Sequence, residues 1–519
     1  MIGRMATVGG FTLLSRMTGF ARDIVLAAVL GAGPVADAFF VALRLPNHFR
    51  AIFAEGAFNA AFVPAYARIR QQGGAEPAKL FADQIFTLLF ASQIILLMAA
   101  LVFTPGVIAL LAPGFVADPG QFALAVELTR ITFPYLLLVT LVTLYGGILN
   151  ALGRFAIAAA APILLNLSMM AALAFYIYFP TAGHAAAWGV LVAGCLEAIV
   201  VAADARRQGV LPALRRPRFD QELTLFLKRF GPATLGSAGT QIALFADTII
   251  ASFLATGALS ALYYADRLNQ LPIGVIGIAA GTVLLPEMAS RIAAGDETGA
   301  RHAQNRAVEL TLLLSVPCLV AFLIVPDLIM RALFMRGAFT AADAAAAAAT
   351  LAAYGIGLLP FVLMRSVTVT FLARGDTMTP VKALAVAVAV NVALKIVLMG
   401  PLAQVGLAFA TSAGAWVNFL LLLWLARRAG LVAIDQRLIH AAGRLALAGL
   451  VMALALWLAQ RPVAALVSEW TSLRDETALA ILAATGAAVY GGLLAALFGR
   501  EWLALFRRKA VAGPHPPTG

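Results

Sequence analysis

The sequence predicts an all-α polytopic membrane protein with fourteen transmembrane helices. Its 519 residues are 62% hydrophobic and only 12% charged, and the mean hydropathy is +0.93, whereas a soluble domain is about 45–50% apolar and about 25% charged. Long apolar runs such as A-L-A-V-A-V-A-V-N-V-A-L-K-I-V-L-M lack the alternation of a membrane β-barrel. Because only helices and closed barrels satisfy their own backbone hydrogen bonds in hydrocarbon, these runs are expected to be helices.

The predicted spans follow one another along the whole chain. A span needs about 20 mostly apolar residues, and the second and eighth ranges are the least regular because charges interrupt them. The ranges are 5–31, 35–64, 81–111, 121–150, 156–179, 184–205, 223–256, 259–286, 307–331, 343–373, 380–400, 404–427, 438–459 and 477–498. The first of these contains arginines and continues at span length, so we interpret it as a transmembrane helix rather than a cleavable signal.

Basic residues gather in alternate loops. The loops after the even-numbered spans, together with both termini, hold most of the lysines and arginines, and the stretch 206–229 is the most basic of them. Cytoplasmic loops carry such an excess, so both termini are expected in the cytoplasm. The net charge of +12 therefore reflects topology and anionic lipid headgroups rather than nucleic acid.

The first twelve spans contain an internal repeat. Three pairs of similar segments lie about 225 residues apart, which indicates a duplicated six-helix unit. The pairs are centred on Pro64 and Pro286, Pro134 and Pro360, and Asn166 and Asn391. Because each unit has an even number of spans, the two lobes form a parallel repeat. We expect an N-lobe at 1–206, a basic linker at 207–222, a C-lobe at 223–428, and two extra helices with a tail at 429–519.

Arginines inside the predicted spans are the strongest indication of function. Arg16 and Arg22 lie in the first span, Arg44 and Arg50 in or near the second, and Arg267 in the eighth. An arginine at the bilayer centre costs about 2.5–3.5 kcal/mol on insertion scales, so intramembrane charges usually have a function.

Four acids accompany these five arginines, namely Asp23, Asp37, Glu55 and Asp266. One interpretation is that the arginines form buried ion pairs or extend to the membrane surface. The alternative is a net cationic site for an anionic substrate, since the guanidinium fork matches phosphate oxygens.

No enzyme or metal-site motif accompanies these charges. The sequence contains no Walker A motif, no Ser-His-Asp arrangement and no metal-ligand cluster, and Cys195 and Cys318 lie in apolar runs. We therefore expect a secondary transporter without cofactor, not an enzyme.

Several stretches resemble signatures of one family of transporters. S-R-M-T-G-F-A-R-D at 15–23, F-A-E-G-A-F-N-A-A-F-V-P at 53–64 and Y-Y-A-D-R-L at 263–268 are similar to those of the MurJ (MviN) family of the MOP superfamily. Further similarity at A-P-G-F, F-P-Y-L-L, A-S-F-L-A and G-D-T-M-T-P extends along the chain.

This resemblance implies a lipid II flippase in the bacterial inner membrane. Such a protein moves the undecaprenyl-pyrophosphate-linked peptidoglycan precursor to the periplasmic leaflet by alternating access, and we expect a monomer. The resemblance implies that two lobes enclose a cationic cavity and that the last two helices form a groove for the lipid tail. It places the substrate-binding residues at Arg16, Arg22, Arg50, Arg267 and Asp37, with Asp23, Glu55 and Asp266 supporting them.

The resemblance also points to a sodium site that this sequence changes. Some relatives bind sodium through an Asp on the seventh helix and an Asn and Asp one turn apart on the eleventh. Asp247 and Asn391 fit that pattern, but Lys395 replaces the second acid. We expect the Lys395 ammonium to occupy the place of the cation and to pair with Asp247, so a sodium site is doubtful. The alternative is a lysine that extends outward to the membrane surface.

Three other functions remain open at this point. A flippase for another polyprenyl-linked glycan would have the same charge requirements. A multidrug cation antiporter of the same superfamily would need carboxylates, which are outnumbered here. A structural scaffold without transport activity would pair every intramembrane arginine with an acid.

Overall fold

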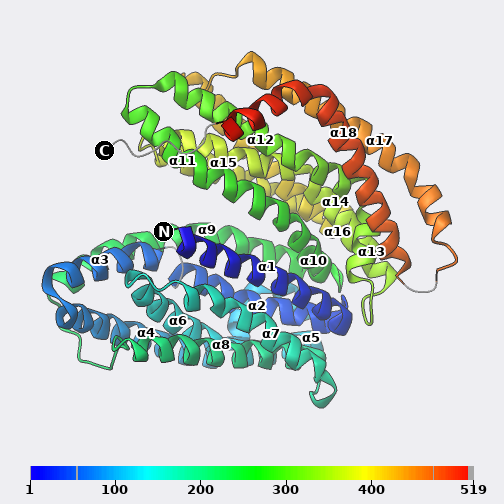
Figure 1. Ribbon diagram of the computed structural model, residues 1–519. Coiled ribbons are helices and arrows are strands. Elements are labelled where there is room, and N and C mark those ends of the chain that lie inside the picture. The colour runs from blue at the N-terminus through cyan, green and yellow to red at the C-terminus, as the bar shows by residue number, and fades with distance from the viewer. Residues whose placement is uncertain (1, 54–56, 471–472, 512–519) are drawn as a thin grey trace. The chain divides into compact units, whose positions relative to one another are not determined.

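The computed structural model describes residues 2–53, 57–470 and 473–511, and these residues form helices and connecting loops with no strand among them (Figure 1). The helices are α1 Ile2–Leu30, α2 Pro34–Phe53, α3 Ala57–Gly73, α4 Ala75–Leu111, α5 Pro119–Thr132, α6 Pro134–Ala151, α7 Ala156–Ala174, α8 Ala182–Arg207, α9 Gln221–Ser252, α10 Ala258–Pro272, α11 Ile278–Ala293, α12 Glu297–Ile324, α13 Pro326–Phe334, α14 Ala341–Ile356, α15 Leu358–Leu372, α16 Met378–Arg428, α17 Gln436–Leu466 and α18 Arg474–Val511. Short 3₁₀ turns occupy Pro113–Ala117 and Tyr176–Tyr178, and a π-helical turn occupies Ile273–Gly277.

The helical fold class predicted from the hydropathy is confirmed. Among the described residues, nine helical segments are long and apolar enough to cross a membrane. The longest, α16, covers two predicted spans and bends at Ala403, whose φ of 46° is non-helical. The protein is therefore a multi-pass membrane protein, while the exact count of fourteen spans stays a prediction.

The irregular eighth span has a structural cause. Its first part is α10, which ends at Pro272, and the π-helical turn Ile273–Gly277 follows before α11. Proline lacks the N–H that an α-helix needs and clashes with the preceding turn. Single π-turns inside helices often occur at functional sites, and this one comes shortly after Arg267.

The chain forms two compact units. Unit 1 contains residues 1–264 and 334–343, and unit 2 contains 265–333 and 344–519. The segment 334–343 joins unit 1 because it hydrogen-bonds to the end of α1, where the Ala338 N–H donates to the Ala28 carbonyl at 2.7 Å. The domain boundaries expected from the repeat stay a prediction.

Unit 1 is a helical bundle with aromatic packing at one end. Phe58 and Phe62 on α3 stack at 5.1 Å between ring centroids, and Phe226 on α9 meets both of them edge-on. The linker after α8 is fixed to α4, since the Ala213 N–H donates to Asp83 at 2.9 Å. The basic linker is thus attached through its backbone, which leaves its side chains available to the surroundings.

Unit 2 is built around α12. Helices α11, α15 and α17 contact it, and α18 packs on α17. The Tyr490 hydroxyl of α18 donates to the Leu313 carbonyl of α12 at 2.9 Å. Arg306 on α12 forms a two-bond contact at 2.9 and 2.7 Å with Asp435, the N-cap of α17. The last two helices are therefore integral parts of unit 2.

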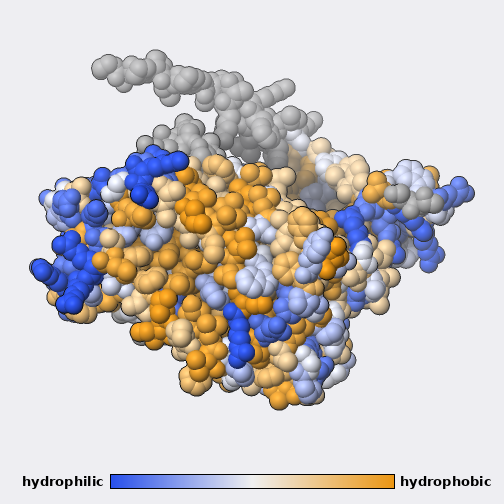
Figure 2. All heavy atoms as spheres, turned by 90° about the horizontal axis from the view of Figure 1, so that it is seen from below, coloured by the Kyte–Doolittle hydropathy of each residue, from blue (hydrophilic) through white to orange (hydrophobic). Residues whose placement is uncertain are grey.

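The outer surface matches a lipid environment. Figure 2 shows hydrophobic residues gathered over the middle of one face, with hydrophilic residues toward its ends. On α4 alone, the exposed side chains include Ile95, Val102 and Phe103. Exposed apolar area of this extent marks contact with lipid or protein.

Candidate substrate-binding arginines

Arg22 lies in a buried charge cluster of unit 1. Its guanidinium donates two hydrogen bonds, of 3.1 and 2.7 Å, to Oδ1 of the adjacent Asp23. The Tyr263 hydroxyl donates to the same oxygen at 3.1 Å, and the Tyr263 ring stacks on Phe40 at 3.9 Å. Arg22 and Asp23 are 8% and 3% exposed. The aspartate therefore balances the charge of this arginine and restricts its orientation.

Arg16 precedes Arg22 by about 1.7 helical turns, in a segment of α1 that is hydrogen-bonded to Asn166. The Asn166 amide on α7 donates to the Ser15 carbonyl and to the Thr18 hydroxyl, both at 3.1 Å. These two residues flank Arg16 in the S-R-M-T-G motif. Within the described parts of the chain Arg16 has no ion-pair partner, and its side chain is half-buried. The polar residues of the motif thus fix the helix that presents Arg16.

Asp37 acts as the cap of another helix. It is 2% exposed, and its carboxylate accepts hydrogen bonds from the Gly257 N–H at 2.7 Å and from the Ser260 N–H and hydroxyl at 2.9 and 2.6 Å. These donors belong to the N-terminus of α10, where free N–H groups and the helix dipole favour an anion. Glycine is required at 257 because φ is +91° and a Cβ would lie 2.9 Å from the Ala32 carbonyl oxygen. Asp37 therefore fixes the start of the helix that carries Arg267.

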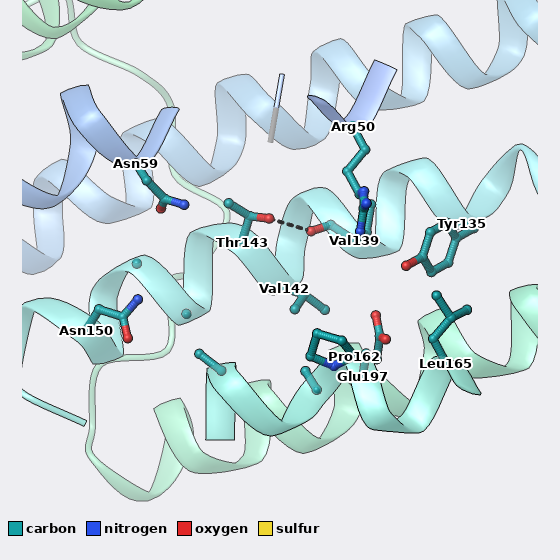
Figure 3. Close-up of a pocket in the computed structure, with 14 residues that line it drawn as sticks. Arg50, Asn59, Tyr135, Val139, Val142, Thr143, Asn150, Pro162, Leu165 and Glu197 are labelled. Atoms are coloured by element: carbon teal, nitrogen blue, oxygen red, sulfur yellow. Dashed lines mark hydrogen bonds between the residues drawn. The ribbon is translucent and has the colours of Figure 1, made fainter. Parts of the chain in front are cut away.

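Arg50 lines a polar pocket inside unit 1 (Figure 3). The pocket has a volume of about 240 Å³ and lies among α2, α3, α6, α7 and α8. Its polar lining residues are Arg50, Asn59, Tyr135, Thr143, Asn150 and Glu197. The neighbouring Arg44 donates to the Thr248 hydroxyl of α9 at 3.1 Å. The two arginines of the second predicted span therefore have different surroundings.

Glu197 is the residue of this pocket that the sequence analysis missed. It lies within the apolar stretch V-A-G-C-L-E-A-I-V of α8 and is 3% exposed. The sequence does indicate Glu197 as a candidate functional residue, because an acid in the middle of an apolar span is as unusual as an arginine. It belongs to none of the motifs that carry the resemblance.

Unit 2 holds the remaining intramembrane bases, Arg267, Arg365 and Lys395. Arg267 is half-buried on α10, and the Gln270 amide donates to the adjacent Asp266. Arg365 on α15 passes beside Gly277 of the π-turn, where a Cβ would lie 2.9 Å from its Cδ and Nε atoms. Glycine at 277 therefore makes room for an arginine side chain.

The predicted ion-pair residues divide between the two units. Asp247 lies on α9 of unit 1, whereas Asn391 and Lys395 lie on α16 of unit 2. Lys395 is only 2% exposed, and Asn391 packs against Gly414. The pairing of Lys395 with Asp247 stays a prediction. Glu55, expected to support the site, lies outside the described residues.

Within the described ranges, no group of three His, Cys, Asp or Glu side chains is arranged to hold a metal ion. Cys195 and Cys318 are both free thiols, the first exposed and the second partly buried. The charge chemistry of these ranges is therefore that of arginine, lysine and isolated carboxylates.

Comparison with known proteins gives the family. The family model for lipid II flippase MurJ matches residues 26–471. The chain belongs to the MurJ family. A probable lipid II flippase MurJ of Rhizobium meliloti (strain 1021) is 42% identical over 464 residues, which cover 88% of this chain and 86% of that protein.

Solved structures show that the fold extends beyond the MurJ family. A lipid II flippase MurJ in an inward closed conformation has a TM-score of 0.80 at 23% identity, covering 96% of this chain and 99% of that one. An inward-facing multidrug resistance MATE family transporter of the MOP superfamily has a TM-score of 0.69 at 15% identity, covering 82% and 98%. Flippases and multidrug transporters thus share this fold, so the fold does not by itself determine the substrate.

Proposed function

We propose that this chain flips lipid II, the undecaprenyl-pyrophosphate-linked peptidoglycan precursor, from the cytoplasmic to the periplasmic leaflet. The observation that carries the proposal is the match to the lipid II flippase family over residues 26–471. The intramembrane arginines supply the matching chemistry, since the pyrophosphate is the part of lipid II that hydrocarbon excludes most strongly. The protein acts as a transporter and makes or breaks no covalent bond.

Arg16, Arg22, Arg50 and Arg267 bind the pyrophosphate in this proposal. Each guanidinium can donate two parallel hydrogen bonds to phosphate oxygens, which a lysine cannot. Asp23 and Asp37 support the site indirectly, the first by orienting Arg22 and the second by fixing the start of α10. The substrate site then alternates between access from the two sides of the membrane, while the polyprenyl tail stays in lipid beside α17 and α18.

The protein works as a monomer in the bacterial inner membrane, with both termini in the cytoplasm. No metal ion is required, because Lys395 supplies a fixed positive charge where some relatives bind sodium. Transport should therefore be unaffected when potassium or choline replaces sodium. Activity that rises steeply with sodium would contradict this part of the proposal.

The function is tested by depletion in the native cell. Loss of the protein should stop growth and leave lipid II in the cytoplasmic leaflet, and the wild-type gene should restore both. Arg16→Ala, Arg22→Ala and Arg267→Ala should fail to restore growth although the proteins reach the membrane. Arg130→Ala is the matched control, because Arg130 is an exposed arginine at the end of α5. Full growth on any two of the three alleles would remove the arginines from the substrate site.

The same depletion separates the rival functions. If lipid II is distributed normally and a different polyprenyl-linked glycan accumulates on the cytoplasmic side, the protein serves that glycan instead. If no lipid-linked precursor accumulates and only sensitivity to organic cations changes, the antiporter function applies.

A further inference from the structure

Glu197 is a buried acid for which the proposed flipping cycle has no role so far. It lies near the middle of α8 and is 3% exposed. An ionised carboxylate in an apolar interior is strongly disfavoured unless a positive charge compensates it, and otherwise it takes up a proton. The charge on Glu197 therefore depends on what lies opposite.

The compensating charge is Arg50. The guanidinium of Arg50 and the carboxylate of Glu197 point toward one another across the pocket in unit 1 (Figure 3). Arg50 is also one of the arginines that we propose to bind the pyrophosphate. A single guanidinium therefore has two anionic partners, one from the protein and one from the substrate.

The pocket has the properties of a hydrated site. Its volume of about 240 Å³ holds several water molecules, since one water occupies about 30 Å³ in the liquid. The Asn59 Oδ1 atom is buried without a hydrogen-bond partner among the described residues. Pro162 on α7 removes a helix N–H, which leaves the Ala158 carbonyl at the pocket wall without its usual donor. Waters in the pocket can satisfy these acceptors and carry a proton to Glu197.

Few other titratable groups face Glu197. Among the described lining residues, α2 contributes Arg50 and α6 contributes Tyr135, while α7 contributes apolar residues only. On α5, Glu127 lies 3.2 Å from His184, which is in the first turn of α8 and far along the helix from Glu197. On α1, which also contacts α8, Arg22 and Asp23 bind each other. Arg50 is thus the positive charge that lies opposite Glu197 in this pocket.

We propose that the Glu197 carboxylate and the substrate pyrophosphate compete for Arg50, and that Glu197 binds a proton when the pyrophosphate takes its place. While Arg50 faces Glu197, it favours the ionised form of the carboxylate. When the pyrophosphate binds Arg50, Glu197 takes one proton from pocket water and becomes neutral. When the pyrophosphate leaves, the proton returns to water and Arg50 pairs with the carboxylate again. This proposal rests on the proposed function and couples proton uptake to substrate binding.

Calorimetry tests the coupling directly. The full-length protein is titrated with lipid II at neutral pH in two buffers of different ionisation enthalpy, and the difference in heat gives the protons taken up. The bridging pyrophosphate of lipid II has no group that titrates near neutral pH. Wild type should take up a measurable fraction of a proton, at most one, per lipid II bound, and the uptake should increase when the titration is repeated at higher pH.

Three variants test whether Glu197 is the group that takes up the proton. Glu197→Gln should bind lipid II with no linked proton and several-fold more tightly, because no carboxylate competes for Arg50. Glu197→Asp should retain the uptake. Glu127→Gln is the matched control, an exposed acid of the same unit, and should behave as wild type. Binding by wild type without proton uptake, or equal uptake by Glu197→Gln, would overturn the proposal.

A substrate-free measurement separates this proposal from the flipping function. If wild type does not bind lipid II, the proposed function fails, and infrared spectroscopy still tests the site. Arg50→Gln should show the stretching band of a protonated carboxyl at neutral pH, and Arg50→Gln/Glu197→Gln should lose it. Absence of that band in Arg50→Gln would show that Glu197 does not bind a proton in response to Arg50.

Discussion

The two compact units distribute their interior charges differently. In unit 1, Arg22 is bonded to Asp23, and Arg50 shares a pocket with Glu197. The described helices of unit 2 carry Arg267, Arg365 and Lys395, with Asp266 as the acid beside them. Glu297 and Asp435 bind arginines at the starts of helices, and the buried Glu309 in the middle of α12 is paired with Arg306. The excess of interior positive charge is therefore greater in unit 2.

One position of the internal repeat accounts for part of this difference in interior charge. Asn418 precedes the arginine pair at the end of α16 by the same distance as Glu197 precedes the pair at the end of α8. Asn418 is neutral, and its amide donates to the Met364 sulfur at 2.7 Å. The first unit thus has a carboxylate where the second has an amide. A duplicated bundle can acquire different electrostatics in its two copies through one such position.

The largest effect is expected at Arg267, because unit 2 has the greater excess of interior positive charge and we propose that Arg267 binds the pyrophosphate. Arg267→Ala should reduce flipping about 100-fold or more, and Arg267→Lys should recover little because an ammonium lacks the bidentate fork. The rate of lipid II transfer in proteoliposomes measures both. Near-wild-type transfer by Arg267→Lys would mean that charge alone is sufficient.

A large loss of stability is expected at Asp37, the acid of unit 1 that caps α10. Asp37→Ala leaves two N–H groups and one hydroxyl buried without their acceptor. A buried group that loses its partner costs about 1–3 kcal/mol, so thermal unfolding in detergent should move to clearly lower temperature. Asp37→Asn retains one acceptor oxygen and should be intermediate. Equal stability of all three proteins would contradict the capping role.

A smaller effect is expected at Gly277, which tests whether Arg365 contributes to unit 2. A Cβ at this position would lie 2.9 Å from the Arg365 side chain, so the arginine must move aside. Gly277→Ala should slow flipping several-fold with normal expression. Gly492→Ala on α18 is the control, because nothing lies within 4 Å of its Cβ position. If the two variants transfer lipid II equally fast, the position of Arg365 has no influence on transport.

The smallest effect concerns an acid of unit 2 outside the membrane interior. Burial acts to raise the pKa of Asp435, but hydrogen bonds from the Leu438 N–H and Arg306 outweigh it and hold that pKa below its usual value of 3.8. A lowered pKa in the folded state means that the contact stabilises the protein at neutral pH and is lost as the pH falls through that lowered pKa. The stabilisation from Asp435 should thus be constant between pH 8 and 5, and the melting temperature should fall below about pH 4 as this stabilisation is lost. Asp435→Asn should reduce that acid-dependent loss, and an unchanged profile would show that the contact is energetically neutral.

The helical fold and the importance of the intramembrane arginines could be predicted from the sequence, because a span in lipid consists almost entirely of apolar residues. Hydropathy indicates where helices run, and an arginine in an apolar run is visible without any structure. The pair of Arg22 with Asp23 was among the interpretations of the sequence, because the two residues are neighbours in the chain. Partners from distant parts of the chain were not predictable. Asp37 meets Gly257 and Ser260, which are far away in the chain, and only tertiary packing brings them together. Glu197 was overlooked because it belongs to no motif, and its significance depends on Arg50 across a pocket.

The most direct measurement is the appearance of lipid II on the far leaflet of sealed proteoliposomes. The purified protein is reconstituted with labelled lipid II, and a membrane-impermeant reagent reports the fraction that has crossed. Wild type and Arg130→Ala should transfer lipid II well above protein-free vesicles, whereas Arg16→Ala and Arg267→Ala should remain at the protein-free level. Transfer by the Arg16→Ala and Arg267→Ala proteins at the wild-type rate would contradict the claim that intramembrane arginines carry the pyrophosphate.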